Sequence, residues 1–184
     1  MKKGYNLLIL KALKFFVDNP YEKIHLREFS RKLKISLNSS QRFLNLFLEK
    51  EFIIEKREAN LRYFQANLES IVFKNIKLTF SLEKINKSGI IKNLKEKVFS
   101  FVLFGSVAEG KDDLKSDYDF LIISKNNQEI KKIFSEFEGK FHKEINLHIF
   151  TLDKWKEQAK INKAFYQEII AKGVCLIGEK PIIN

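Results

Sequence analysis

The chain has 184 residues, of which 45% are hydrophobic, and a formal net charge of +11 at pH 7. This length allows one good-sized domain or two small ones, and 18 phenylalanines are enough to build cores. The only cysteine, Cys175, excludes an intrachain disulfide and favours a reducing, cytoplasmic location. No apolar run approaches the ~20 residues that a membrane-spanning helix needs, so we expect no membrane partner.

The positive charge is concentrated in the first half of the chain. Residues 1–90 hold 18 Lys and Arg against 9 Asp and Glu, a net charge of +9, whereas residues 91–184 hold 16 against 14, a net charge of +2. All five arginines lie between residues 27 and 62. A basic first half indicates a polyanionic partner, most simply nucleic acid.

The first part of the chain predicts three helices and a β-hairpin. Apolar residues recur at helical spacing in three segments, residues 6–18, 26–33 and 39–50. Two short segments rich in β-branched and aromatic residues predict paired strands, residues 52–55 and 61–65. The inner stripe of the third helix leaves several polar side chains facing outward: Ser39, Ser40, Arg42 and Asn45.

Three helices followed by a two-stranded hairpin resemble a winged helix-turn-helix domain, with matching residues at 48–53 and 62–64. In that family the third helix enters the major groove of DNA and the wing contacts the backbone or the minor groove. The resemblance implies DNA contacts from Ser39, Ser40, Arg42 and Asn45 on the helix and from Arg57 and Arg62 on the wing. The alternative is a winged helix that contacts protein. A homodimer is a further expectation, because such domains commonly bind DNA as two-fold dimers.

Residues 68–97 have helical spacing that is broken at Ser88-Gly89. We therefore expect a winged helix over residues 1–68, a connecting helix over 69–89 and a second domain over 90–184. In the second domain, short apolar or alternating runs predict strands at four places, residues 99–104, 120–123, 143–151 and 173–178. It predicts further helices at residues 90–97, 127–139 and 152–172. The expected fold class is α+β, with a mixed sheet covered by helices on one face and open on the other.

The boundary between the first two of these strands carries the motif with the clearest chemistry. The first strand ends in Gly105-Ser106, and the second opens with Asp117-Tyr118-Asp119. Side chains alternate along a strand, so the two carboxylates point the same way and favour a cation between them. A glycine at a strand end lets backbone approach a ligand closely. This layout is suited to a metal-bound nucleoside triphosphate, although a solvated acidic turn between core strands would show the same residues.

Gly105-Ser106, ten residues and then Asp117-x-Asp119 resemble the signature of the DNA polymerase β nucleotidyltransferase superfamily, most closely its minimal nucleotidyltransferases. The resemblance implies that Asp117 and Asp119 bind Mg²⁺ or Mn²⁺. It also implies that Gly105 and Ser106, with Lys111 or Lys115, bind the phosphates of a nucleoside triphosphate. The members of this superfamily carry a third carboxylate on the next strand, at the position that Asn146 occupies here.

Asn146 is a departure, because an amide is a neutral ligand and a poor base. Glu144 and His148 share its face of the strand, so Glu144 is a candidate for the missing oxygen and His148 for a general base. The alternative is that both side chains only line a solvated edge. A second departure is Glu109, which lies in a loop where related sequences often carry a basic residue.

Two functions follow from these resemblances. The first is Mg²⁺-dependent transfer of a nucleoside monophosphate to a hydroxyl of a protein or an RNA. The protein acceptor would be a partner such as a cognate toxin, as in antitoxin nucleotidyltransferases. The second is a DNA-binding transcriptional regulator, whose nucleotidyltransferase-like domain senses nucleotide or joins subunits without turnover.

Overall fold

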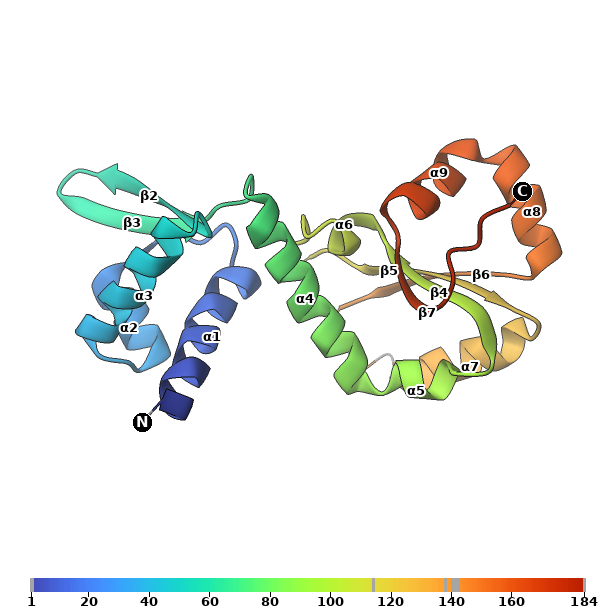
Figure 1. Ribbon diagram of the computed structural model, residues 1–184, viewed down its shortest axis with the longest axis horizontal. Helices are drawn as coiled ribbons and strands as arrows, with labels where there is room; N and C mark the ends of the chain where they lie inside the picture. Colours follow the sequence, from blue (N-terminus) through green and yellow to red (C-terminus); the bar gives the residue numbers. More distant parts are fainter. Residues whose placement is uncertain (1, 114, 138, 140–142, 184) are drawn as a thin grey trace. The chain divides into compact units, whose positions relative to one another are not determined.

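The computed structural model describes residues 2–113, 115–137, 139 and 143–183 of the chain, which divides into two compact units, Met1–Phe80 and Ser81–Asn184 (Figure 1). The first unit begins with the elements α1 (Lys2–Asp18), β1 (Ile24–His25), α2 (Leu26–Leu33) and α3 (Leu37–Glu49). A hairpin follows, made of β2 (Ile53–Glu58) and β3 (Leu61–Ala66). Helix α4 (Ile71–Ser88) contains the point at which the chain passes into the second unit.

Aromatic side chains form the core of the first unit. Phe16 stacks on Phe29 with ring centroids 5.4 Å apart, and the ring of Phe47 stands edge-on to Phe16 at 6.2 Å. All three are buried, because they lie on the inner faces of α1, α2 and α3. Strands β2 and β3 pair antiparallel, and β1 pairs with the other edge of β3, so the sheet order is β1-β3-β2. The interpretation of this unit as a winged helix-turn-helix stays a prediction.

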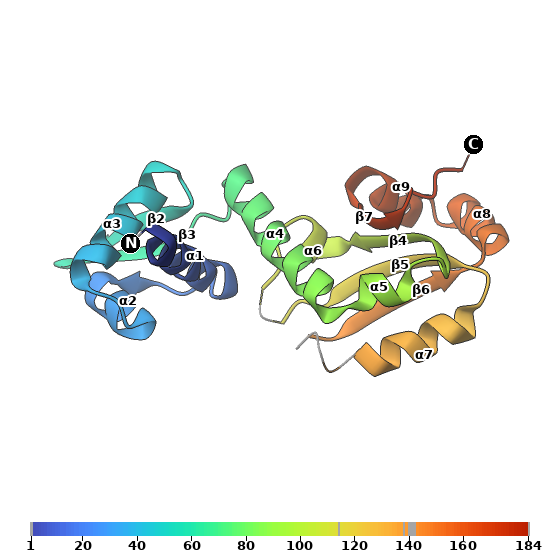
Figure 2. The same ribbon diagram turned by 60° about the horizontal axis from the view of Figure 1, so that its bottom comes forward.

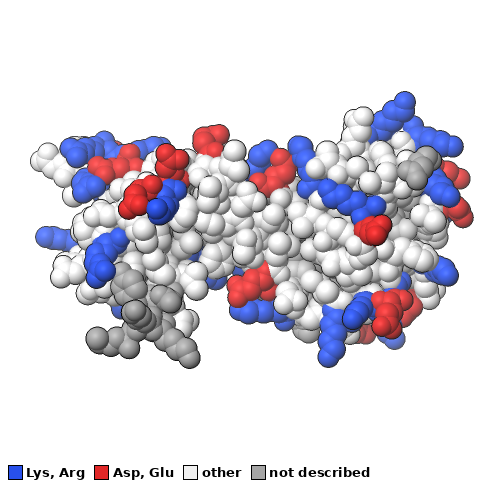
Figure 3. All heavy atoms as spheres, viewed as in Figure 1, with Lys and Arg blue, Asp and Glu red and all other residues white. Residues whose placement is uncertain are grey.

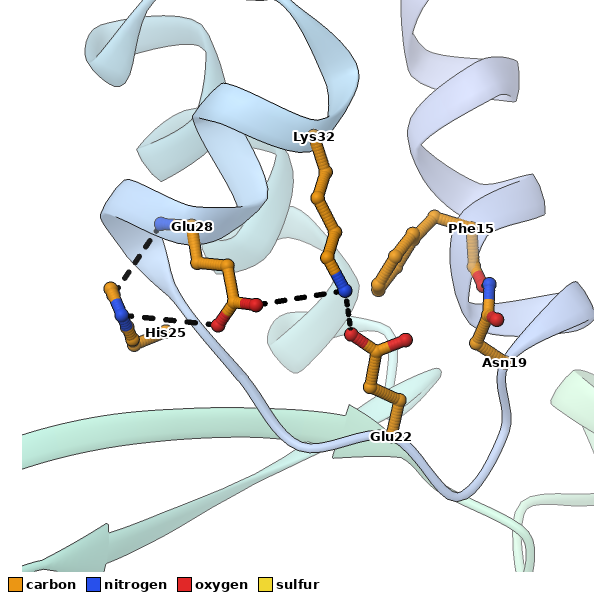
Figure 4. A network of polar contacts seen from close by, with 6 residues as sticks. All are labelled: Phe15, Asn19, Glu22, His25, Glu28 and Lys32. Carbon is orange, nitrogen blue, oxygen red and sulfur yellow. Dashed lines mark hydrogen bonds and ion pairs between the residues drawn. The ribbon is translucent and has the colours of Figure 1, made fainter.

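Local polar contacts hold the start of α2. His25 is its N-cap, and the imidazole Nδ1 accepts a hydrogen bond of 3.4 Å from the Glu28 backbone N–H. Lys32, one turn farther along, pairs with both Glu22 and Glu28, as Figure 4 shows. The Glu22 contact is the largest of the interactions that raise the Lys32 pKa. As the N-cap of α2, His25 therefore has a structural role at a helix end.

One expected outward residue of α3 points inward. Ser40 is fully buried, so the expectation that it faces a nucleic acid is wrong. Ser40 lies three and four residues before the buried Phe43 and Leu44, which places all three on one helical stripe. Ser39 is half-exposed, and its backbone N–H and side-chain hydroxyl bond to the N-cap residue Ser36.

The second unit contains a mixed sheet. Its elements after α4 are α5 (Ile90–Leu94), β4 (Val98–Phe104), α6 (Gly105–Ala108), β5 (Tyr118–Ser124), α7 (Asn127–Phe137), β6 (Ile145–Phe150), α8 (Leu152–Ile161), α9 (Lys163–Lys172) and β7 (Val174–Gly178). The sheet order is β6-β5-β4-β7. Strand β4 pairs antiparallel with β5 and β7, whereas β5 and β6 are parallel. The expected mixed sheet is thus present.

Helices cover both faces of this sheet, so the expectation of one open face is wrong. Phe101 and Phe120 point to one face and contact Phe134 of α7. The opposite face carries Val102, Leu121 and Ile123, which pack with Trp155 of α8 and Ile169 of α9. Figure 2 shows α5 and α7 on one side of the strands and α8 and α9 on the other. The cause is visible in the strands themselves, since β4 and β5 are apolar on both sides.

The long helix expected over residues 152–172 is two helices. Asn162 ends α8 and serves as the N-cap of α9, where its side-chain oxygen accepts a 3.1 Å hydrogen bond from the Phe165 backbone N–H. An asparagine at such a position competes with helical hydrogen bonding and so favours a new helix start. The break lets α8 and α9 both reach the sheet face that carries Leu121.

We predict that Asn162→Ala lowers the free energy of unfolding of the second unit by about 0.5–2 kcal/mol, because it removes the cap of α9. Trp155, the only tryptophan, is buried in this unit, so its fluorescence during urea denaturation reports on this unit. Asn162→Asp keeps an acceptor oxygen and should stay near the wild-type value. Equal destabilisation by both substitutions would contradict a capping role.

Candidate active site

The turn between β4 and α6 is shaped for a close approach of backbone to carboxylate. Gly105 has φ +69°, in the left-handed region, and a Cβ placed on it would lie 3.3 Å from the Asp119 Cβ and overlap the carboxylate. Its neighbour Phe104 pairs directly with Asp119 across the sheet. A side chain at position 105 would therefore push Asp119 away, so the glycine is required by both conformation and space.

Asp117 and Asp119 flank the buried Tyr118 at the start of β5. Tyr118 is anchored in the core by a parallel stack on Phe120, with centroids 5.8 Å apart. Its backbone N–H also donates to the Glu144 carbonyl at 2.9 Å. Because Tyr118 points to the α7 face, both carboxylates are turned toward the opposite face.

Asn146 meets both carboxylates. It is the register partner of Asp119 in the parallel pair β5–β6. Its Nδ2 lies 3.2 Å from Asp117 Oδ2 and 3.1 Å from Asp119 Oδ1. One amide group therefore donates a hydrogen bond to each of two acids, which offsets the repulsion between them. The structure brings together Gly105, Asp117, Asp119 and Asn146.

The other two candidate catalytic residues lie on either side of Asn146. Glu144 is exposed and directly precedes β6. His148 is on β6, and its ring centroid lies 5.5 Å from that of Phe104 and 5.2 Å from that of Phe165. The imidazole is thus held against aromatic rings from β4 and α9, on the same strand face as Asn146.

Two lysines meet Glu109 just after the first turn of α6. Lys111 Nζ donates to one carboxylate oxygen of Glu109, and Lys172 Nζ on α9 donates to the other at 3.1 Å. The Lys111 contact is the main cause that holds the pKa of Glu109 below its usual range. The pairing therefore favours folding above that range and is lost as the pH falls through the lowered pKa. The sequence alone does not indicate a role for Lys172, because only the packing of α9 brings its side chain to Glu109.

The loop before β5 is fastened by a third lysine. Lys143 Nζ donates to Asp112 Oδ2 at 3.0 Å and to the Asp113 carbonyl at 2.7 Å. The Asp113 carboxylate accepts from the Lys115 backbone N–H at 2.8 Å and from the Ser116 hydroxyl at 3.0 Å, and the backbone bond is the main cause that lowers its pKa. The Lys115 side chain is exposed.

The donor set fits one divalent cation. Two carboxylates converge within hydrogen-bond distance of one atom, and carboxylate and amide oxygens are ligands that Mg²⁺ and Mn²⁺ accept. Among the residues that the structure describes, no group of three or more His, Cys, Asp or Glu side chains is placed to hold a metal ion. The acidic part of the site is thus the pair Asp117 and Asp119.

The residues expected to contact DNA lie on two elements of the first unit. Arg42 and Asn45 are exposed on α3, and Gln41 donates a 2.8 Å hydrogen bond to Asn45 Oδ1. On the hairpin, Glu55 pairs with both Arg57 and Arg62. The Arg62 contact is the main cause that lowers the pKa of Glu55. Basic and acidic side chains accordingly lie side by side over β2 and β3 in Figure 3.

No helix in the described part of the chain has the length and apolar character required to cross a membrane.

Two solved structures are similar to 53% of this chain, each with a TM-score of 0.39. One is a crystal structure of a toxin–antitoxin with AMP-PNP, 18% identical over 73% of that chain. The other is a mutant of the toxin–antitoxin MntA–HpeT, 12% identical over 74% of that chain.

No curated protein matches the chain. The family described as polymerase beta nucleotidyltransferase matches residues 89–182, just over half of the chain. The matched segment contains the Gly105 turn, both aspartates and Asn146. The chain therefore belongs to the polymerase beta nucleotidyltransferase family.

Proposed function

We propose that the second unit transfers a nucleoside monophosphate from a nucleoside triphosphate to a hydroxyl of a protein or an RNA. The observation that carries the proposal is the convergence of Asp117 and Asp119 on one point beside the Gly105 turn. Membership of a nucleotidyltransferase family supports the reaction class. The choice of a protein or RNA hydroxyl as the acceptor is part of our proposal.

The phosphates would bind at the first turn of α6 and the lysines beside it. Gly105 leaves its backbone accessible to a close ligand, and the Ser106 hydroxyl follows it in the chain. Lys111 and Lys172 both lie within reach of the Glu109 carboxylate, so a triphosphate that displaced Glu109 would meet two cations. The exposed Lys115 would add a third.

Asp117, Asp119 and Asn146 are the residues that would hold Mg²⁺ or Mn²⁺. The bound ion would neutralise triphosphate charge and polarise the phosphoryl group that is transferred. His148 is our candidate to accept the proton of the acceptor hydroxyl, since an imidazole exchanges protons at neutral pH and this one is exposed beside Asn146. Glu144 is the second candidate for that role.

We further propose that the first unit binds DNA as a winged helix and that the chain forms a homodimer on DNA. The support is its charge and the placement of its arginines on the outside, with Arg42 on α3 and both Arg57 and Arg62 on the hairpin. We propose the same boundaries as before, with the winged helix over residues 1–68 and the connecting helix over 69–89. A cytoplasmic location would suit both activities.

One observation favours an alternative function for the second unit, Ser81–Asn184. The amide of Asn146 stands where a third carboxylate would strengthen cation binding, and both aspartates already accept hydrogen bonds from it. A domain of this kind suits nucleotide sensing without turnover. The chain would then be a DNA-binding regulator.

Labelling separates the two functions. With each α-phosphate-labelled nucleoside triphosphate, Mg²⁺ or Mn²⁺ and host lysate, we expect label on a discrete protein or RNA. The double change Asp117→Asn and Asp119→Asn should reduce it more than about a hundredfold, because several kcal/mol of charge stabilisation are lost. Asp153→Asn removes an exposed acid on α8 and is the matched control. No label from wild-type protein that still binds nucleotide would favour the regulator.

The contacts of Lys111 and Lys172 with Glu109 lead us to expect opposite changes in nucleotide affinity for two substitutions. Lys172→Ala should raise the Kd of a fluorescent ATP analogue by roughly threefold to tenfold, as expected for one partly exposed charge contact. Glu109→Gln should lower the Kd, because it releases Lys111 and Lys172 for the phosphates. Lys163→Ala, at the exposed start of α9, should leave the Kd unchanged. Weaker binding in both the Lys172 and the Glu109 variant would instead mean that their contact only holds the loop.

The proposed role of the hairpin in DNA binding can be tested by changing its acidic residue Glu55. Glu55→Gln removes the negative charge between Arg57 and Arg62, so we expect tighter binding to a DNA duplex in fluorescence anisotropy. Glu129→Gln removes the same charge from a lysine-paired acid on α7 and should have no effect. Arg42→Ala should weaken binding and reduce the salt slope by about 1 if its contact is to phosphate. Unchanged affinity in both the Glu55 and the Arg42 variant would argue against a nucleic acid partner.

A further inference from the structure

The amide of Asn146 occupies the point at which two carboxylates converge. Its Nδ2 is 3.2 Å from Asp117 Oδ2 and 3.1 Å from Asp119 Oδ1. Ionised carboxylates only accept hydrogen bonds, so it is the NH₂ group of the amide, which carries two donors, that faces them. The amide oxygen is then directed away from the acids.

The negative charge of the site is small. Asp117 and Asp119 contribute two charges, and Asn146 contributes none. The acids of the adjoining loop face lysines, since Glu109 contacts Lys111 and Lys172 while Asp112 contacts Lys143. Two negative charges balance one divalent cation. A second divalent cation would receive no further carboxylate ligand from these strands. Glu144, which directly precedes β6, does not complete a metal-binding group with Asp117 and Asp119, since the described residues contain no group of three acidic, histidine or cysteine side chains placed to hold an ion.

We propose that this site binds a single divalent cation and that Asn146 is the residue that limits it to one. Asn146 acts in two orientations: it donates its N–H groups to both aspartates when no cation is bound, and it turns its amide to offer the oxygen as a neutral ligand when one is. The inference rests on the proposed function only to the extent that both concern the same site.

The physical basis is the near-equal size of the two ends of an amide. A half-turn of the side chain exchanges Nδ2 for the oxygen without moving the backbone of β6, which stays paired with β5. An aspartate at this position has no donor. Three carboxylates would then repel one another without a cation and attract it more strongly when it is present.

The experiment is a titration of the full chain with Mn²⁺ in the absence of nucleotide, with free ion followed by electron paramagnetic resonance. We expect one ion per wild-type chain and none at this site in the double variant Asp117→Asn, Asp119→Asn. Asn146→Ala, which removes both the donor and the ligand, should bind the ion several-fold more weakly. Asn146→Asp should bind it at least about tenfold more tightly and admit a second ion.

A stability measurement accompanies the titration. In the presence of a chelator, Asn146→Asp should have a lower Tm than wild type, because the three carboxylates lack a donor. Added Mn²⁺ should raise its Tm by more than it raises that of wild type. Asn146→Ala should gain least. If the aspartate variant does not fold, wild type and Asn146→Ala still decide the wild-type stoichiometry and the role of the amide.

Several results would overturn the inference. They are two ions bound to wild type, no ion bound to wild type, equal affinity in wild type and Asn146→Ala, or an Asn146→Asp affinity within twofold of wild type. These outcomes are separate from those of the labelling assay. One Mn²⁺ per chain without any transfer of label would remove the proposed function and leave the inference standing, whereas transfer with two bound ions would do the reverse.

Discussion

The candidate site depends on how closely two strand ends approach each other. Gly105 lies against the carboxylate of Asp119, at a left-handed backbone angle and with no room for a side chain. The approach is enforced by the antiparallel pairing of β4 with β5, whose apolar residues are buried on both faces of the sheet. Interior strands of this kind are close-packed and resist displacement. The hydrophobic core on both faces of the sheet therefore fixes the positions of Gly105 and Asp119, although neither residue is part of that core.

Much of the second unit could be predicted from sequence, because its strands are marked by short apolar runs and by alternation. The alternation of residues 143–151 predicted one strand face for Glu144, Asn146 and His148, since a side chain's face follows from its parity along a strand. The family resemblance implied that Asn146 stands at the position of a third carboxylate, and in the structure it lies opposite Asp119. Contacts between distant segments could not be predicted in this way. Lys172 reaches Glu109 and Lys143 reaches Asp112 only after the helices and loops have packed.

Three errors have separate physical causes. Ser40 is a small polar residue on an apolar helical stripe, and a hydrophobicity pattern alone assigns such a residue to the outside. The break between α8 and α9 depends on the capping bond of Asn162, which competes with an otherwise helical pattern. The sheet was expected to have an open face, although β4 and β5 are apolar on both sides. Continuous apolar runs indicate a strand covered twice.

The register of β5 and β6 has an evolutionary consequence. The backbone already places residue 146 opposite Asp119, with a side chain of the same shape as aspartate and within reach of both acids. The codons for asparagine and aspartate differ by a single base. A lineage can therefore move between a two-acid and a three-acid centre by one point mutation, with no remodelling of the strands around it. If the site binds a cation as proposed, the strength of that binding can change while the fold is retained.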